Sequence, residues 1–167
     1  MKIKKLVWLG LALLCAGAVA QVNVDDPDWK ESPVPPAPAF NKDKLIAIEM
    51  PRYVSLTFGV DPATLVISAD GIVRYVVVAA NATGSISAMY EGIRCATGEV
   101  KTYARYGSNG QWSVAAAPQW LGLTENMPSK HALALARQGV CDGRAAAASS
   151  VAAIVNALKN PNPGQNR

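Results

Sequence analysis

The stretch with the most distinctive chemistry is Tyr90-Glu91-Gly92-Ile93-Arg94-Cys95, which combines a phenol, a carboxylate, a guanidinium and a thiol. Glu91 and Arg94 are three residues apart and would face opposite sides of a regular strand. A β-bulge at Gly92 would bring both side chains to one face, where they could pair. We interpret them as a structural ion pair beside a disulfide, with a polar ligand site as the alternative. No second carboxylate or histidine stands nearby in a recognisable pattern, which disfavours a catalytic acid.

Other polar and aromatic side chains are spaced so that they could form a recognition surface. Arg74 shares strand parity with Val76 and Val78. If that face is buried, Arg74 needs a carboxylate partner, which Glu91 or Glu99 on a neighbouring strand would supply. Arg, Tyr and Trp side chains are typical of interaction surfaces, although they also form the amphipathic rim of many sheets. The candidate residues for an interaction or ligand surface are Arg74, Tyr90, Glu91, Arg94, Arg105 and Trp112.

Signatures of catalysis or of metal and cofactor binding are lacking in the sequence. His131 is the single histidine, and we expect it to face solvent or to cap a helix. The order of residues does not exclude a Ser-His-Asp arrangement, but no Gly-x-Ser-x-Gly elbow supports one. The chain has no phosphate-binding glycine loop and no HExxH or CxxC motif. We therefore expect a protein that is not an enzyme, without a metal site or cofactor.

The N-terminus has the pattern of a secretory signal peptide. Lys2, Lys4 and Lys5 precede an apolar run from Leu6 to Ala16, and Ala18-Val19-Ala20 is a small-x-small cleavage site. We predict cleavage after Ala20. A retained membrane anchor and a lipoprotein signal that uses Cys15 are the alternatives. No later stretch is apolar enough to span a bilayer, so we expect no membrane span after cleavage.

Cleavage would change both the charge and the cysteine count. It leaves 167 − 20 = 147 residues, enough for one domain with a core. Three of the 16 basic residues are lost, so 13 basic residues stand against 12 acidic ones and the net charge falls from +4 to +1. This near-neutral balance excludes an electrostatic case for a nucleic-acid partner. Cys95 and Cys141 remain, and we expect them to pair in an oxidising compartment, with two separate buried thiols as the alternative.

Residues 21–44 form a Pro-rich N-terminal arm. The segment Ser32-Pro33-Val34-Pro35-Pro36-Ala37-Pro38 favours an extended polyproline conformation and forbids helix. The arm is interpreted either as a mobile linker or as a segment that docks, on the domain or on a partner. Trp29 and Phe40, its large apolar residues, would be the docking points.

Residues 45–159 are predicted to form a single α+β domain. Alternating and β-branched runs between turn signals predict strands, and Asp70-Gly71 is a strong two-residue hairpin signal. Apolar spacing predicts helices over 130–138 and 145–158. The expected fold is an antiparallel β-meander of about five to seven strands followed by two C-terminal helices packed on the sheet. Residues 160–167 are expected to be a disordered tail. The predicted strands are 45–48, 54–58, 64–68, 72–80, 85–95, 100–106 and 111–114.

Several of these strings together resemble the CNP-one-like (CNP1-like) family of small exported proteins from Gram-negative bacteria. The resemblance spans about residues 29–142, and Tyr90–Cys95 is its most specific part. The other strings are Trp29–Glu31, Asp70–Tyr75, Tyr103–Arg105, Gly110–Trp112, Trp120 and Cys141. The resemblance implies a periplasmic location, and some members are tied to type IV pilus maintenance. The family carries no catalytic residues over to this chain.

Two functions are compatible with these patterns. The first is a periplasmic, non-enzymatic protein that binds another envelope protein and supports envelope or type IV pilus maintenance. The second is a periplasmic binder or modifying enzyme for a small polar ligand or glycan, with Arg74, Glu91, Arg94 and Trp112 lining its site. A deep pocket on which Arg74 and Arg94 converge would favour the second function.

Overall fold

The computed structural model describes residues 27–143, 145–146 and 150–161. The predicted signal peptide, residues 1–20, lies outside the described residues, and so does most of the predicted tail, from residue 162 onwards. In the described part of the chain, no helix is both long and apolar enough to cross a bilayer.

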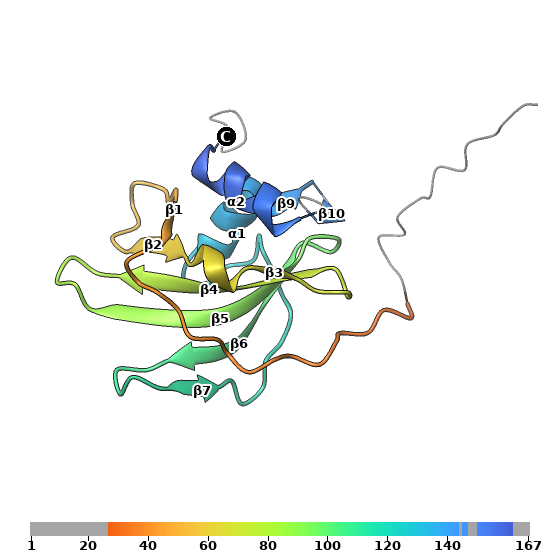
Figure 1. Ribbon diagram of the computed structural model, residues 1–167, viewed down its shortest axis with the longest axis horizontal. Coiled ribbons are helices and arrows are strands. Elements are labelled where there is room, and N and C mark those ends of the chain that lie inside the picture. The colour runs from red at the N-terminus through yellow and green to blue at the C-terminus, as the bar shows by residue number, and fades with distance from the viewer. Residues whose placement is uncertain (1–26, 144, 147–149, 162–167) are drawn as a thin grey trace, which may run out of the picture.

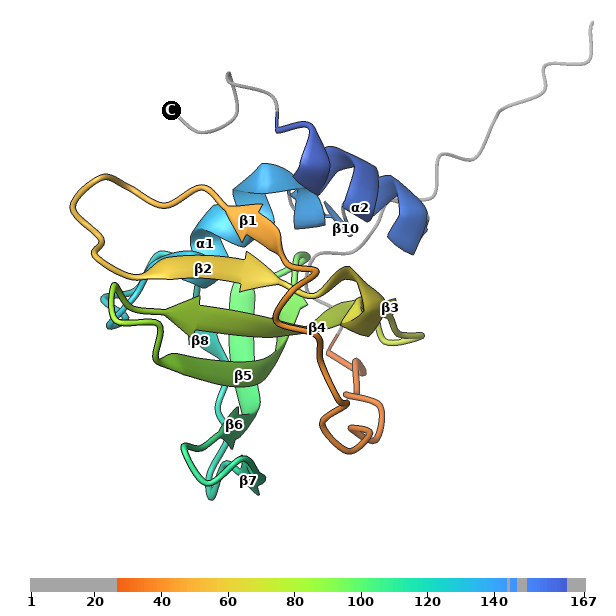
Figure 2. The same cartoon turned by 60° about the vertical axis from the view of Figure 1, so that its left-hand side comes forward.

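The domain is built on an antiparallel sheet of eight strands. Six lie side by side, and Figure 2 shows them fanning from β1 down to β7. β4, β5 and β6 each pair with the next strand in sequence, which confirms the predicted α+β fold with a meander. The six are β1 (Ile46–Ile48), β2 (Thr57–Val60), β4 (Ile72–Ala80), β5 (Ile86–Arg94), β6 (Glu99–Tyr106) and β7 (Trp112–Val114). β3 (Val66–Ile67) pairs with β4, and β8 (Leu121–Gly122) pairs with β6.

One strand begins later than its pattern predicts. The prediction started it at Val54, whereas β2 starts at Thr57. The backbone N–H of Val54 donates to the carbonyl of Pro51 (2.9 Å), so the chain is still turning there. A short 3-10 turn, η1 (Pro62–Thr64), follows β2, and the side chain of Asp61 caps it.

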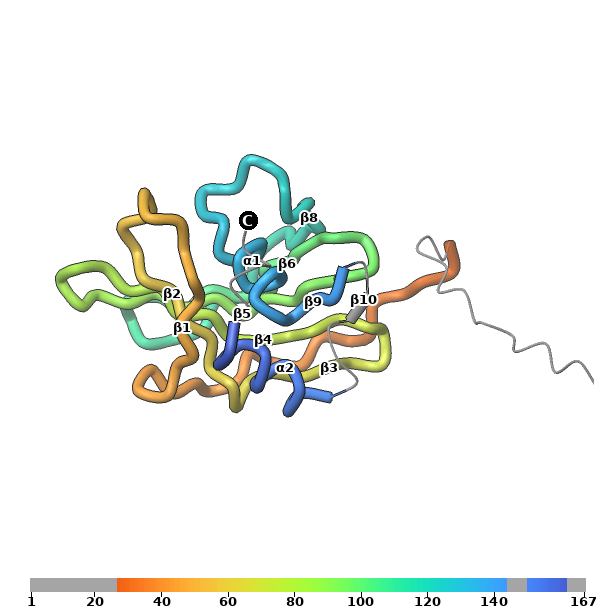
Figure 3. Tube along the Cα trace, turned by 90° about the horizontal axis from the view of Figure 1, so that it is seen from above, coloured from red at the N-terminus to blue at the C-terminus, as the bar shows by residue number. Residues whose placement is uncertain are grey.

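The helical part lies on one side of the sheet (Figures 1 and 3). α1 (His131–Leu135) continues into a wider helical turn, η2 (Ala136–Val140), and the second helix is α2 (Val151–Lys159). The prediction of helix from residue 145 was wrong, because Ala145–Ala146 forms a short strand, β10, against β9 (Cys141–Asp142). A turn at Gly143, which has a positive φ of 64°, allows this pairing. α2 instead begins after Ser150, whose hydroxyl accepts the N–H of Ala153.

The central strand β4 is buried on both faces, as its apolar sequence predicts. Val73, Tyr75 and Val77 face the helices and share a core with Leu135 and Ile154. The predicted packing of the C-terminal helices on the sheet is confirmed on this face.

The opposite face of β4 has a different cover. Val76 and Val78 pack in a second cluster, against which Phe40 of the arm and Trp112 of β7 are placed. In Figure 1 the arm crosses this side of the sheet, away from α1 and α2. The N-terminal arm is therefore the third layer of the domain, and of the two alternatives for it the structure adopts docking on the sheet.

Two links tie the helical layer to the sheet. Cys95, at the end of β5, lies at disulfide-bonding distance from Cys141 of β9, with their Cα atoms 5.5 Å apart, as the sequence predicts. The buried amide of Gln138 donates to the carbonyls of Ala47 (2.8 Å) and Leu158 (3.0 Å) and accepts the N–H of Glu49 (2.9 Å). Gln138 thus fastens the edge strand β1 to the end of α2.

Reducing the Cys95–Cys141 bridge should destabilise the protein. The bridge closes a loop with a sequence separation of 46 residues, worth roughly 4 kcal/mol in the chain-entropy model. Urea unfolding of the Cys95→Ser/Cys141→Ser double variant should show a loss of that order. Reductant should lower the unfolding midpoint of the wild-type chain but leave that of the double variant unchanged. Equal midpoints for the oxidised and reduced wild-type chain would contradict this expectation.

Candidate functional site

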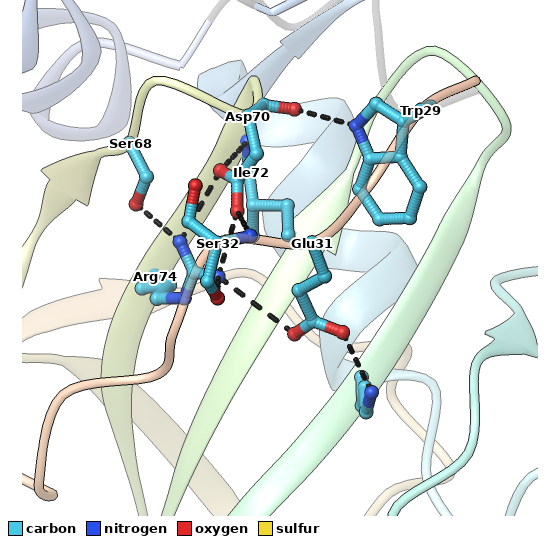
Figure 4. A network of polar contacts seen from close by, with 8 residues as sticks. Trp29, Glu31, Ser32, Ser68, Asp70, Ile72 and Arg74 are labelled. Carbon is cyan, nitrogen blue, oxygen red and sulfur yellow. Dashed lines mark hydrogen bonds and ion pairs between the residues drawn. The ribbon is translucent and has the colours of Figure 1, made fainter. Parts of the chain in front are cut away.

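The most elaborate polar network in the structure joins the N-terminal arm to the sheet (Figure 4). At the outer end of the arm, the indole N–H of Trp29 donates to the backbone carbonyl of Asp70 (2.9 Å). The backbone N–H of Ser32 donates to the carboxylate of Asp70 (2.8 Å). The guanidinium of Arg94 lies over the Trp29 ring, 3.7 Å from its centroid, in a cation–π contact. One end of the arm is thus held at the turn between β3 and β4.

Arg74 is the centre of this network. Its side chain is only 2% exposed and forms an ion pair with Asp70 (2.9 Å), while Glu31 of the arm lies 3.7 Å away. It also donates to the hydroxyl of Ser68 and to the carbonyl of Ser32 (3.4 Å). Burial alone would raise the pKa of the Asp70 carboxyl, but its hydrogen bonds and the charge of Arg74 outweigh burial and lower that pKa. Asp70 therefore stays ionised opposite Arg74.

The predicted carboxylate partners of Arg74 were wrong. Glu91 pairs in register with Tyr75, so its side chain lies on the face opposite to that of Arg74. Asp70 stands in the preceding turn, where it can reach the guanidinium from the same side. The second acid, Glu31, comes from the arm and also forms an ion pair with Lys101 of β6 (2.7 Å).

The inner end of the arm is held by aromatic contacts. The indole N–H of Trp112 donates to the carbonyl of Pro38 (3.2 Å). Phe40 packs edge-on against Tyr106 and Trp112, with ring centroids 5.1 and 5.9 Å away. Where the arm turns towards β1, the N–H of Asn41 donates to the side chain of Asp61 (2.7 Å). Both ends of the arm are fixed by side chains of the sheet and its turns.

Four of the six candidate surface residues therefore contribute to one surface, which we call the arm face: Arg74, Tyr90, Arg94 and Trp112. Tyr90 belongs to it because it lines a cavity together with Arg74 and the arm residues Pro35 and Pro36. Arg105 is exposed and contacts the sulfur of Met89. Glu91 lies on the far side of the sheet, so the predicted Glu91–Arg94 pair does not form. The predicted bulge at Gly92 of β5 does not form: the register shifts between Tyr90 and Glu91 because Tyr103 of β6 is the extra residue.

Glu91 instead belongs to a second, buried polar cluster under the helices. Its carboxylate is hydrogen-bonded by Tyr75 (3.1 Å), Thr102 (3.0 Å) and Nε2 of His131 (2.8 Å). Burial alone would raise the pKa of Glu91, but the charge of His131 and these three hydrogen bonds outweigh burial and lower it. The cluster is therefore built to keep one carboxylate ionised inside the core.

The expectation that His131 faces solvent or caps a helix was wrong. The residue is 4% exposed, and its ring stacks on Phe58 with centroids 5.0 Å apart. Its second nitrogen, Nδ1, lies 2.6 Å from the hydroxyl of Ser129. Ser129, His131 and Glu91 thus form a continuous chain of hydroxyl, imidazole and carboxylate, in which the imidazole provides a hydrogen-bond partner for the buried carboxylate.

The roles of Glu31, Asp70 and His131 in these networks were not predicted from the sequence. Asp70 was interpreted only as a turn residue, although an acid four positions before a buried Arg is a possible partner. Glu31 belongs to the Trp29-Lys30-Glu31 string, which stood out only through the family resemblance. For His131 no local signal was available, because its partner is 40 residues away.

Comparison with known proteins finds a match to a family model. The model of the CNP1-like family matches residues 24–159, which include the arm, the sheet and both helices. Neither the curated proteins nor the solved structures contain a match.

Removing the charge of Glu91 should change how stability depends on pH. A carboxyl whose pKa is lowered by folding stabilises the protein above its unfolded pKa, here 4.5, and that contribution disappears as pH falls through the folded value. Glu91→Gln should cost about 2–3 kcal/mol at pH 7 and should flatten the loss of stability below about pH 4.5. Chemical unfolding across this pH range measures both effects. Glu125→Gln, at an exposed position, is the control and should retain the wild-type slope.

Removing the charge of Asp70 should destabilise the arm face. Asp70→Asn leaves the buried guanidinium of Arg74 with Glu31 alone, at 3.7 Å, and breaking a buried pair in this way costs about 3 kcal/mol. Urea unfolding measures the loss. The matched control is Asp43→Asn, which breaks a pair with Lys42 whose side chains are 76% and 60% exposed, so it should have little effect. Equal losses of unfolding free energy in the two variants would show that the Arg74–Asp70 pair contributes no more to stability than the exposed pair does.

Proposed function

We propose that this chain, which belongs to the CNP1-like family, is an exported, non-enzymatic interaction factor of the cell envelope. It would act in the periplasm, after cleavage behind Ala20, by binding another envelope protein. A role in envelope or type IV pilus maintenance rests on the resemblance described in the sequence analysis.

The observation that carries this proposal is the way in which the sheet binds the arm. The arm face holds an extended polypeptide segment by ion pairs of the partly buried Glu31, a cation–π contact at Trp29 and hydrogen bonds to backbone groups. Aromatic side chains, arginines and backbone hydrogen bonds are the means by which proteins recognise extended, Pro-containing segments. Four of the six residues singled out in the sequence, Arg74, Tyr90, Arg94 and Trp112, thus line or contact this segment.

The geometry gives less support to a small-ligand or glycan site. Such a site would need Arg74 and Arg94 to converge on an open pocket. Arg74 is instead paired with Asp70 inside the domain, and Arg94 lies over the ring of Trp29. Neither guanidinium is oriented towards a common ligand.

Crosslinking in living cells tests the proposal. A photoreactive amino acid replaces Ala39 or Ile86, two exposed residues that line one cavity beside Phe40 and Trp112. We expect both positions to capture an envelope protein in the periplasmic fraction. Ala152, an exposed residue on α2 across the sheet, is the control position. Recovery of the chain in the cytoplasm, or adducts that are no stronger at Ala39 and Ile86 than at Ala152, would overturn the proposal.

A further inference from the structure

The docked arm leaves some buried polar atoms at the arm face without a hydrogen bond. In the described residues, three buried side-chain atoms have no hydrogen-bond partner, and all three lie at this interface: Oε1 of Glu31, Nε of Arg74 and the hydroxyl of Tyr103. The guanidinium of Arg74 lies 5.6 Å from the centre of the Tyr103 ring, and burial raises the pKa of the Tyr103 hydroxyl. A buried polar atom that lacks a hydrogen bond destabilises the docked state. A segment better matched to this face would remove that cost.

The packing between arm and sheet is also incomplete. A cavity of about 160 Å³ lies between the prolines of the arm and side chains of the sheet, among them Ser68, Arg74 and Tyr90. Arg74 is 2% exposed, and its Nε atom is one of the three unpaired groups. Atoms that line a void lose dispersion contacts on that side. The cavity is large enough for a side chain or carbonyl group that the arm does not provide.

The contacts that do form define what the face recognises. Arg74 and Lys101 receive a carboxylate, since both approach Glu31. Arg94 receives an aromatic ring two residues before that acid. Trp112 and Asp70 bind backbone groups, which carry no sequence requirement. A matching segment is extended, contains proline, and carries an aromatic residue shortly before an acidic one.

We propose that the arm face docks such a segment from a partner protein, and that the chain's own arm occupies the face until the partner replaces it. This inference rests on the proposed function and specifies its partner. A tethered arm competes with any free segment at an effective concentration in the millimolar range. The partner segment must therefore bind the face more favourably than the arm does, and the unpaired groups and the cavity provide that advantage.

Binding of a free arm peptide to a chain with a weakened arm tests the inference. The full chain carries Glu31→Lys, which places a cation beside Arg74 and Lys101 and leaves every sheet residue intact. The probe is a fluorescent peptide with the wild-type sequence of residues 27–41. Fluorescence anisotropy should show binding about ten-fold tighter to this variant than to the wild-type chain, because the arm no longer competes. Lys30→Ala, at an exposed neighbouring position, should bind the peptide as weakly as the wild-type chain.

Three controls make the outcome decisive. A peptide with lysine in place of Glu31 should bind at least about ten-fold more weakly than the wild-type peptide. Trp29→Ala, which weakens the arm without adding charge, should repeat the result if Glu31→Lys unfolds the chain. Equal binding of both peptides, or no gain in either variant, would overturn the inference while leaving the crosslinks from Ala39 and Ile86 unaffected. A dimer of the wild-type chain that dissociates in both arm variants would identify a second copy, and not a partner protein, as the occupant.

Discussion

The ion pair between Arg74 and Asp70 is the contact on which the architecture of this domain depends. It places a full positive charge in the interior of the sheet, with the side chain 2% exposed, and such a charge must be compensated on every side. Oδ1 of Asp70 accepts from the N–H of Ile72 at the turn between β3 and β4, and Oδ2 accepts from both Arg74 and the N–H of Ser32 in the arm. One buried cation thus couples a turn, the central strand and a segment about 40 residues earlier in the chain.

The two polar clusters lie back to back across the sheet. Arg74 and Tyr75 are neighbours in β4 and, because strand side chains alternate, they belong to opposite faces. Arg74 organises the face covered by the arm, whereas Tyr75 donates to Glu91 on the face covered by the helices. Gly92, which pairs with Arg74, has no room for a Cβ atom, which would lie 2.7 Å from both Ile72 and the hydroxyl of Tyr103. The charged and aromatic residues around Arg74 fit only because this position is glycine.

Local sequence patterns predicted the strands and turns of this fold better than they predicted which distant side chains contact one another. The Asp70-Gly71 turn, the long strands β4 to β6 and the Cys95–Cys141 bridge follow from signals that are short in sequence or limited to two candidates. The partner of Arg74, the burial of His131 and the docking of the arm depend on residues that meet only after the chain has folded. Local patterns can also predict the wrong element. Alanine favours helix, but the two alanines at residues 145–146 form a strand that pairs with β9. Helix propensity is a weak preference that such tertiary contacts override.

Gln138 gives the sheet a property that its strand order alone would not. An edge strand normally presents free N–H and C=O groups to any chain that can add beside it. At β1 one side-chain amide occupies both kinds of group at once, accepting from Glu49 and donating to Ala47. The side-chain amide thus makes the same two hydrogen bonds that the backbone of one residue in a neighbouring strand would make. These two backbone groups at the margin of the sheet are therefore unavailable to an added strand.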